Sequence, residues 1–424
     1  MNHLGRPAPR APTRAPLAAQ PSRETETTQE AQAAPIQEAP RRQSRPWLVG
    51  AGAFVISALF ALRLLVPNDM DPTIFVAFGD ESPIQTPFGV RLLGDVATRH
   101  GGGHDGQSFF ILANDPWHLH PEEHAALLDR PAYRAQRMLF PMIAGGFGFF
   151  PPWTIVWAML LTNVFALAAG AWFAAKLAVA GGLPPWLGLW VPLNVGLLFE
   201  LDIGGGGILA YVFCLGAVYA LLRDELGGAS ALFAAGALTR ETMVIFAVGV
   251  FILWWLERRR FAWPIVLTPL AAMAVWSLYL GIRLQGVSGV GGGTGNFDLP
   301  FTGLMAGIVS WTKDPLRLIV SLVLVAAVTW FVPLALRSRI ALAWGALPFA
   351  VLGLILSEHV WREPFNFSRA LAPIFTALPF LIVARDRGAD PSRPLPAEHG
   401  DGVDHREHGG HHQAMTPVRR DFGA

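Results

Sequence analysis

Residues 47–66 read WLVGAGAFVISALFALRLLV and contain one charged side chain, Arg63. This run has the roughly 20 apolar residues that a helix needs to cross a bilayer. The rest of the chain continues the pattern, since 52% of its 424 residues are hydrophobic and only 15% are charged. A soluble globular protein carries about 25% charged residues. The sequence therefore predicts an all-α polytopic membrane protein rather than an ordinary cytosolic enzyme.

The two ends of the chain differ from this apolar middle. Residues 1–46 are rich in Pro, Ala, Gln, Thr and Arg, and residues 385–424 contain a cluster of histidines. Neither end has enough large apolar residues to form a core, so we predict two disordered tails. Arg41, Arg42 and Arg45 stand directly before the first span, and the positive-inside rule then puts the N-terminal tail in the cytoplasm. A net charge of +1 excludes a strongly basic protein that binds nucleic acid.

Residues 47–384 form the predicted transmembrane domain. Two of its hydrophobic segments are unusual: 138–150 is too short to span, and 229–256 is interrupted by Thr239–Arg240–Glu241–Thr242. Four groups of arginines lie between or after the hydrophobic segments: Arg223, Arg258–Arg260, Arg337 with Arg339, and Arg385 with Arg387. If all four groups are cytoplasmic, both segments dip into the membrane and return, which gives eight spans plus two re-entrant elements. Counting both as spans gives ten, and either count puts both termini in the cytoplasm. The other hydrophobic segments are 153–178, 184–201, 206–222, 261–282, 316–336, 340–357 and 369–384.

The polar segment 68–137 is then a large first loop on the outer side. Its pattern predicts two short helices, Asp105–Asn114 and Pro121–Asp129. Loops of this length are usually functional or disordered, and the aromatic content here favours a functional one. Residues 283–315 and 358–368 share the outer side, and the glycines between 286 and 293 predict a flexible loop that could act as a lid.

The densest group of polar residues in the outer loop is His104–Asp105–Gly106–Gln107. A carboxylate at this place can act as a general base or hold a divalent cation. The alternative is that Asp105 only caps the helix that follows, which Asp does well.

A second group runs from Asp129 to Pro141 and contains Tyr133, Arg134 and Arg137. Arginine guanidinium groups bind phosphate through two parallel hydrogen bonds. The alternative is a positive rim beside the lipid headgroups.

Further charges lie within or beside apolar segments. Arg240 and Glu241 interrupt one hydrophobic segment, and such charges usually have a function or an internal partner. The structural alternative is an ion pair between Arg240 and Glu241 themselves. Arg369 opens the last span, where it could meet an anion or simply extend to the lipid headgroups.

Asp69–Met70–Asp71 has the D-x-D spacing that can hold a metal bound to a sugar diphosphate. A solvated loop explains the same three residues. A divalent cation is thus the one cofactor that the sequence suggests, with Asp69 and Asp71 as weak candidate ligands.

The order of these motifs resembles the GT-C superfamily of membrane glycosyltransferases. The similarity is greatest to a bacterial branch linked to cell-surface polysaccharide. The shared motifs are His104–Asp105–Gly106–Gln107, Asp115–Pro116, Tyr133–Arg134–Ala135–Gln136–Arg137–Met138–Leu139–Phe140–Pro141, Leu238–Thr239–Arg240–Glu241 and Arg369–Ala370–Leu371–Ala372–Pro373. Phe140 stands where tyrosine is commoner in that branch, and Ser108 stands where an aromatic residue is usual.

The resemblance implies a GT-C-like bundle in a bacterial plasma membrane, with sugar transfer at the outer face. The donor would be a polyprenyl-phosphate sugar, and the acceptor a glycan or lipid of the cell envelope. Asp105 would be the catalytic base. Arg137, Arg240 and Arg369 would hold the lipid phosphate, and Gln107, Tyr133, Arg134 and Glu241 would complete the substrate site.

Two other functions fit the same sequence. Broken helices with charges at depth are typical of transporters, so a transporter or flippase of lipid-linked glycans is one alternative. A non-catalytic component of a complex that assembles cell-surface glycopolymers is the other.

Overall fold

The computed structural model describes residues 45–285 and 295–387. The protein is mostly helical (74%), in agreement with the predicted all-α fold class. The two predicted disordered tails fall almost entirely outside the described residues, and so do the glycines between 286 and 293.

Four helices among the described residues are long and apolar enough to cross a membrane. They are α1 (Pro46–Leu65) with the 3-10 turn η1 (Val66–Asn68), α7 (Pro152–Ala180), α12 (Pro264–Arg283) and α14 (Pro315–Leu336). The pair α17 (Pro364–Ala370) and α18 (Ala372–Asp386) passes the same test together but is bent by 71°. These helices support a membrane protein, whereas the count of eight to ten spans stays a prediction.

The remaining apolar helices are shorter because the chain breaks them. The predicted segment 229–256 is divided at residues 240–242 into α10 (Leu226–Thr239) and α11 (Met243–Arg258). Segment 184–201 is divided into the 3-10 helix η4 (Pro185–Trp190) and α8 (Val195–Asp202), where the Asn194 side chain caps α8. The others are α6 (Leu139–Ala144) with η3 (Gly146–Gly148), α9 (Gly207–Leu222), α13 (Thr302–Trp311) and α15 (Ala341–Ile355). A further short helix, α16 (Glu358–Trp361), is polar at its start.

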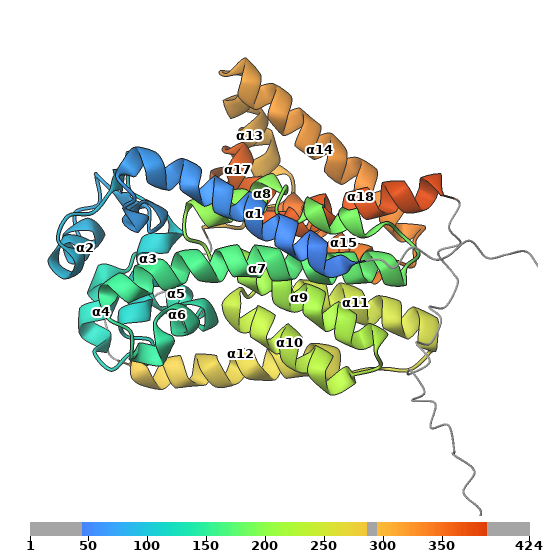
Figure 1. Ribbon diagram of the computed structural model, residues 1–424, viewed down its shortest axis with the longest axis horizontal. Coiled ribbons are helices and arrows are strands. Elements are labelled where there is room, and N and C mark those ends of the chain that lie inside the picture. The colour runs from blue at the N-terminus through green and yellow to red at the C-terminus, as the bar shows by residue number, and fades with distance from the viewer. Residues whose placement is uncertain (1–44, 286–294, 388–424) are drawn as a thin grey trace, which may run out of the picture. The chain divides into compact units, whose positions relative to one another are not determined.

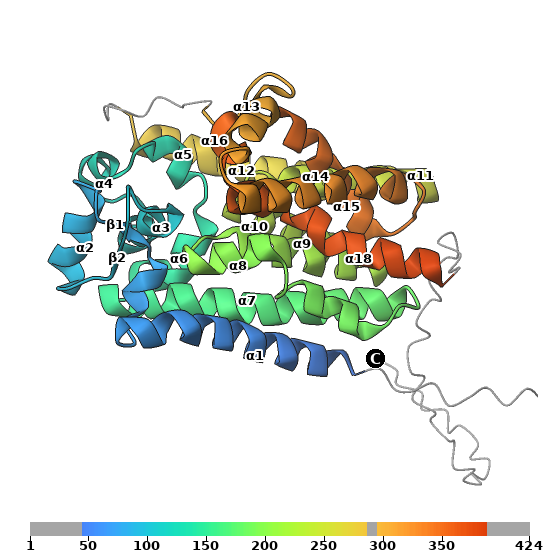
Figure 2. The same cartoon turned by 90° about the horizontal axis from the view of Figure 1, so that it is seen from above.

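The long helices α1, α7 and α12 lie roughly along one direction, and α14 runs obliquely to them (Figure 1). Helices α1 and α7 pack side by side, and α7 also contacts α9, which packs on α10 (Figure 1). On the other side, α15 packs against α11 and α18. Helix α1 begins and α18 ends at the same end of the bundle, and the region from α2 to α6 lies at the opposite end (Figure 2).

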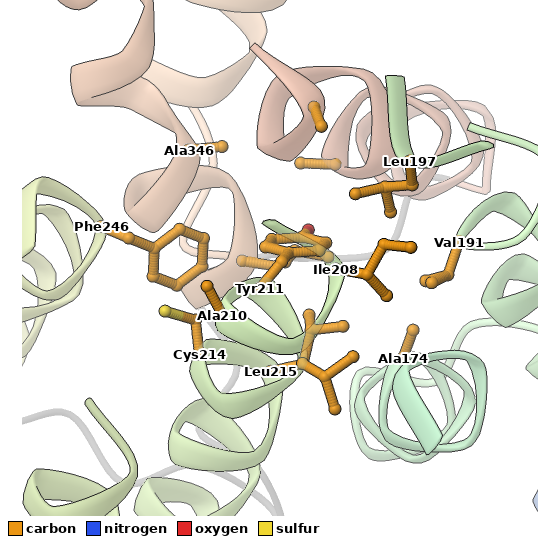
Figure 3. Packing of buried hydrophobic residues seen from close by; sticks show 14 of the residues in the cluster. Ala174, Val191, Leu197, Ile208, Ala210, Tyr211, Cys214, Leu215, Phe246 and Ala346 are labelled. Carbon is orange, nitrogen blue, oxygen red and sulfur yellow. The ribbon is translucent and has the colours of Figure 1, made fainter. Parts of the chain in front are cut away.

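The core of the bundle is made where α7, α8, α9, α11 and α15 meet (Figure 3). Tyr211 and Phe246 pack edge to face with their ring centroids 6.0 Å apart. Ala174 of α7 and Ala210 of α9 are fully buried. Small residues at such positions let membrane helices approach closely, and close packing then replaces the hydrophobic driving force that lipid does not supply.

The first loop is an ordered region with its own core. It contains η2 (Pro72–Phe75), β1 (Phe78–Gly79), α2 (Gln85–Leu93), β2 (Thr98–Arg99), α3 (Asp105–Asn114), α4 (Pro121–Leu127) and α5 (Pro131–Ala135). Strands β1 and β2 pair in parallel, with Phe78 opposite Thr98. Phe78 and Phe88 pack edge-on against Phe110 of α3, which fixes that helix within the region. Helix α3 has the predicted bounds, and α4 ends two residues earlier than predicted.

Candidate functional site

All eight residues predicted for the catalytic and substrate sites line a single cavity of about 460 Å³. They come from α3, from α5 and the turn after it, from the connection between α10 and α11, and from α17. Their proximity is a result of the fold, and their chemical roles remain predictions. The eight residues are Asp105, Gln107, Tyr133, Arg134, Arg137, Arg240, Glu241 and Arg369.

The charges of the cavity wall favour an anionic ligand. The wall contains more arginines than carboxylates, and a surface of excess positive charge attracts anions. Leu352, Leu356 and Val360 add an apolar section to the same wall. The arginines are Arg130, Arg134, Arg137, Arg240 and Arg369, and the carboxylates are Asp105, Asp129 and Glu241.

Asp105 is the first residue of α3 and lies between two guanidinium groups. Arg134 donates to its Oδ1 through Nη1, and Arg369 donates to its Oδ2 through Nη1 at 2.9 Å. Gly106 allows this position, because a β-carbon there would overlap the carbonyl oxygens of Val76 and Ile203. The alternative that Asp105 only caps a helix is therefore wrong, since the N-cap of α3 is His104 and each oxygen of the Asp105 carboxylate has an arginine partner from another element.

The electrostatic surroundings of Asp105 keep it ionised. Burial acts to raise the pKa of this carboxyl, but Arg369, Arg134 and Arg137 lower it more, so that the pKa lies well below its usual range. For the neighbouring His104, burial and the positive charge of Arg99 lower the pKa. Asp105 is thus a bound anion in this state, and it becomes a better proton acceptor only when the arginines turn to another partner.

Arg137 forms the most complete ion pair of the cavity. Its Nε and Nη2 atoms donate to the two carboxylate oxygens of Glu241 at 2.8 and 2.6 Å. Nη2 also donates to the Tyr133 hydroxyl, and the guanidinium lies over the Tyr133 ring, 4.5 Å from its centroid. Asn296 donates to the same hydroxyl from its Nδ2 at 3.0 Å. Tyr133 therefore connects Arg137 to the segment that precedes α13.

Arg240 lies at the break between α10 and α11 in an extended backbone conformation. Its Nη1 donates to Glu200, whereas the adjacent Glu241 binds Arg137. The two neighbours therefore have separate partners, and the alternative of a mutual Arg240–Glu241 pair is wrong. The interruption of the apolar segment directs one cation and one anion into the cavity.

Glu200 belongs to this network although the sequence did not predict it as a site residue. Its side chain is only 3% exposed at the end of α8, and it contacts both Arg240 and Arg369. A signal was present in the sequence: a carboxylate ends an apolar segment just before the run Gly204–Gly207. A buried carboxylate of this kind requires a cationic partner.

Arg369 reaches the cavity because the chain bends after it. Helix α17 ends at Ala370 and α18 starts at Ala372, at an angle of 71°. Arg369 is therefore held inside the protein between two carboxylates, with its side chain 17% exposed. This position differs from the alternative of an arginine that extends to the lipid headgroups.

Gln107 and Asp71 have local structural partners. The Gln107 amide donates to the carbonyl of Gly102 at 2.8 Å, which holds the cavity wall at residues 102–103. Asp71 caps η2 by accepting from the backbone and hydroxyl of Thr73 at 2.9 and 2.6 Å. Asp69 has a left-handed backbone with a φ of 51°.

Asp69 and Asp71 do not line the cavity. Within residues 45–285 and 295–387, the one group of three side chains that could share a metal ion is Asp80, Glu81 and His100, and all three are exposed. The divalent cation therefore stays a prediction without a site in the cavity wall.

No family model, curated protein or solved structure matches this chain. The cavity itself offers two chemical capacities. Its arginines can bind an anionic group, and Asp105 can take up a proton beside that group.

Proposed function

We propose that the protein is a GT-C-type glycosyltransferase that uses a polyprenyl-phosphate sugar at the outer face of a bacterial plasma membrane. Its product would be a polysaccharide or glycolipid of the cell envelope. The observation that carries this proposal is the Asp105 carboxylate held between Arg134 and Arg369 in a cavity with excess arginine. Such a site joins the two groups that transfer from a lipid phosphate requires, namely a base and cations for the leaving phosphate.

The proposed reaction inverts the anomeric carbon. The acceptor hydroxyl oxygen forms a bond to that carbon, and the bond between the carbon and the phosphate oxygen breaks. The electron pair leaves on the phosphate, where Arg137, Arg240 and Arg369 would stabilise the added charge. The hydroxyl proton passes to Asp105. Because the enzyme acts outside the cell, a lipid carrier explains how an activated sugar reaches the site.

The cavity wall suits a donor that has both a charged phosphate and an apolar lipid chain. The arginines suit the phosphate, and the apolar section formed by Leu352, Leu356 and Val360 suits the adjacent isoprenoid chain. Asp105, Asp129 and Glu241 can accept hydrogen bonds from sugar hydroxyls. Both chain termini would be cytoplasmic in this arrangement, since Arg41, Arg42 and Arg45 precede the first span.

One observation favours a transporter as the second candidate. The helix break at residues 240–242 directs charged side chains into a cavity, and transporters bind substrates at such breaks. A flippase would move a lipid-linked glycan without forming a covalent product.

The test compares variants in a strain that lacks the protein. Mass spectrometry would measure envelope glycans and accumulated polyprenyl-linked intermediates after complementation. The strain complemented with Asp105→Asn should contain at least about 100-fold less product than the strain complemented with the wild type, because a general base accelerates a reaction by about 10²–10⁴-fold. Asp95→Asn is the matched control, because Asp95 lies exposed in the same loop away from the cavity.

Full product in the Asp105→Asn strain would refute the role of Asp105. Loss of glycan export with no missing glycosidic bond would favour the flippase. Full activity of a variant with Asp105, Arg137 and Arg240 all replaced would instead favour a non-catalytic component.

A further inference from the structure

Arg369 contacts two carboxylates that differ in their access to the cavity. Its Nη1 donates to Oδ2 of Asp105 at 2.9 Å, and its Nε lies 3.5 Å from Oε1 of Glu200. The Asp105 side chain lines the cavity and is 16% exposed, whereas the Glu200 side chain is 3% exposed. A ligand in the cavity can therefore reach the Asp105 side of this arginine while Glu200 stays behind it.

Arg134 also contacts two carboxylates, but both of them line the cavity. Its Nη1 donates to Asp105, and its Nε donates to Oδ1 of Asp129 at 2.9 Å. Asp105 is thus the carboxylate that Arg134 and Arg369 share, and each arginine has a second carboxylate nearby: Asp129 for Arg134, and Glu200, which Arg240 also binds, for Arg369. Losing the contact to Asp105 would leave neither guanidinium without an anionic partner.

Glu200 is held firmly in its place. Its Oε2 accepts from the backbone N–H of Gly207 at 3.2 Å, and its Oε1 accepts from Arg240. A β-carbon at residue 205 or at residue 207 would overlap the Glu200 carboxylate. Gly205 and Gly207 therefore leave space for the buried Glu200 carboxylate, and this carboxylate orients Arg240 and Arg369.

We propose that a phosphate ester entering the cavity replaces Asp105 as the partner of Arg369 and Arg134, while Glu200 keeps Arg240 and Arg369 directed at the phosphate. Glu200 is then a positioning residue. Binding of the phosphate releases the Asp105 carboxylate, so the base becomes available only after the donor is bound. The identity of the phosphate ester as a glycosyl donor rests on the proposed function.

The physical reason is competition between two anions for the same guanidinium groups. An arginine fork binds phosphate through charge-assisted hydrogen bonds of the same kind that it makes with a carboxylate. The arginines lower the pKa of Asp105. When the phosphate neutralises their charge, the pKa of Asp105 therefore rises. The carboxylate thereby gains basicity at the point in the reaction where it is needed.

The experiment measures binding rather than transfer. Full-length protein in lipid nanodiscs would be titrated with farnesyl phosphate, and with farnesol as the uncharged control. Asp105→Asn should bind farnesyl phosphate about tenfold more tightly than the wild type, because the competing anion is gone. Farnesol binding should not change. Inorganic phosphate is titrated beside it and shows whether the lipid contributes to recognition.

Glu200→Asp tests the positioning role, because it keeps the charge and withdraws the carboxylate by one methylene. It should bind farnesyl phosphate about tenfold more weakly, since Arg240 and Arg369 lose their alignment. Gly207→Ala keeps every charge and crowds the same carboxylate, so it should weaken binding in the same direction. Asp95→Asn should bind as the wild type does. Thermal unfolding of each variant separates this effect from a purely structural role, which would lower the melting temperature without changing affinity.

The proposal would be overturned if Asp105→Asn bound farnesyl phosphate no more tightly than the wild type does. It would also be overturned if Glu200→Asp and Gly207→Ala folded and bound farnesyl phosphate as tightly as the wild type. A third contrary result would be wild-type protein that binds farnesyl phosphate no more tightly than farnesol. The binding pattern can hold even if no sugar transfer is ever found, in which case only the proposed function fails. Transfer that depends on Asp105 without tighter binding by Asp105→Asn would refute this inference and leave the proposed function intact.

Discussion

Replacing Arg137 by methionine should destabilise the protein more than replacing both members of its ion pair. Arg137 donates to both oxygens of Glu241, and the two side chains are 9% and 23% exposed. Removing one partner of a buried pair costs about 3–5 kcal/mol. Because water reaches part of Glu241, we expect a smaller loss of about 2–3 kcal/mol from the free energy of unfolding.

The assay is a double-mutant cycle of Arg137→Met, Glu241→Gln and the double variant. Thermal unfolding in nanodiscs, followed by tryptophan fluorescence, should show a loss of about 3–6 °C for Arg137→Met. The double variant should lose less than Arg137→Met alone, and therefore less than the sum of the two single losses, because no charge is then left without a partner. The cycle also removes the contribution of the Tyr133 contact, which both variants that lack Arg137 have lost.

Strict additivity of the two single effects would refute this reasoning. It would mean that Arg137 and Glu241 interact separately with water or with other groups. An unchanged melting temperature for Arg137→Met would have the same consequence.

Two further predictions concern the aspartates of the first loop. The folded-state pKa of Asp105 lies below its unfolded value of about 3.9, so its ion pairs should stabilise the protein fully above that pH and lose the contribution as the pH falls through the folded pKa. The difference in melting temperature between wild type and Asp105→Asn should accordingly stay constant from about pH 8 to pH 5 and shrink below about pH 4. A difference that grows as the pH falls would contradict this prediction. Asp71→Ala should cost about 1 kcal/mol of stability, measured by thermal unfolding, because it removes the cap of η2, whereas Asp69→Asn should cost close to nothing. Loss of transfer by Asp71→Ala at unchanged stability would instead favour the metal role.

Local patterns were sufficient to predict several elements. Pro121 and the glutamates after it mark the start of α4, and Asp105 opens α3 as expected. The charges at 240 and 241 predicted the break between α10 and α11, because charged side chains are costly inside an apolar segment. These features depend on residues within one or two turns of each other.

The partners of the site residues could not be predicted in this way. Glu241 binds Arg137, which is 104 residues away, and Asp105 binds Arg369, which is 264 residues away. Hydropathy indicates which segments are apolar, but it does not show which of two adjacent charges faces which neighbour. Glu200 was not predicted for the same reason, since its importance comes from two arginines in other parts of the chain.

The ion pairs of the cavity also limit how the chain can change during evolution. The pairs Arg137–Glu241 and Arg240–Glu200 each join segments that are far apart in the sequence, and losing the carboxylate would leave an arginine uncompensated inside the protein. Substitutions at 137 and 241, or at 200 and 240, are therefore expected to occur together. A variant that kept only one charge of such a pair would be less stable. We therefore expect homologous sequences to change the two positions of a pair together, and to change exposed residues of the first loop independently of one another.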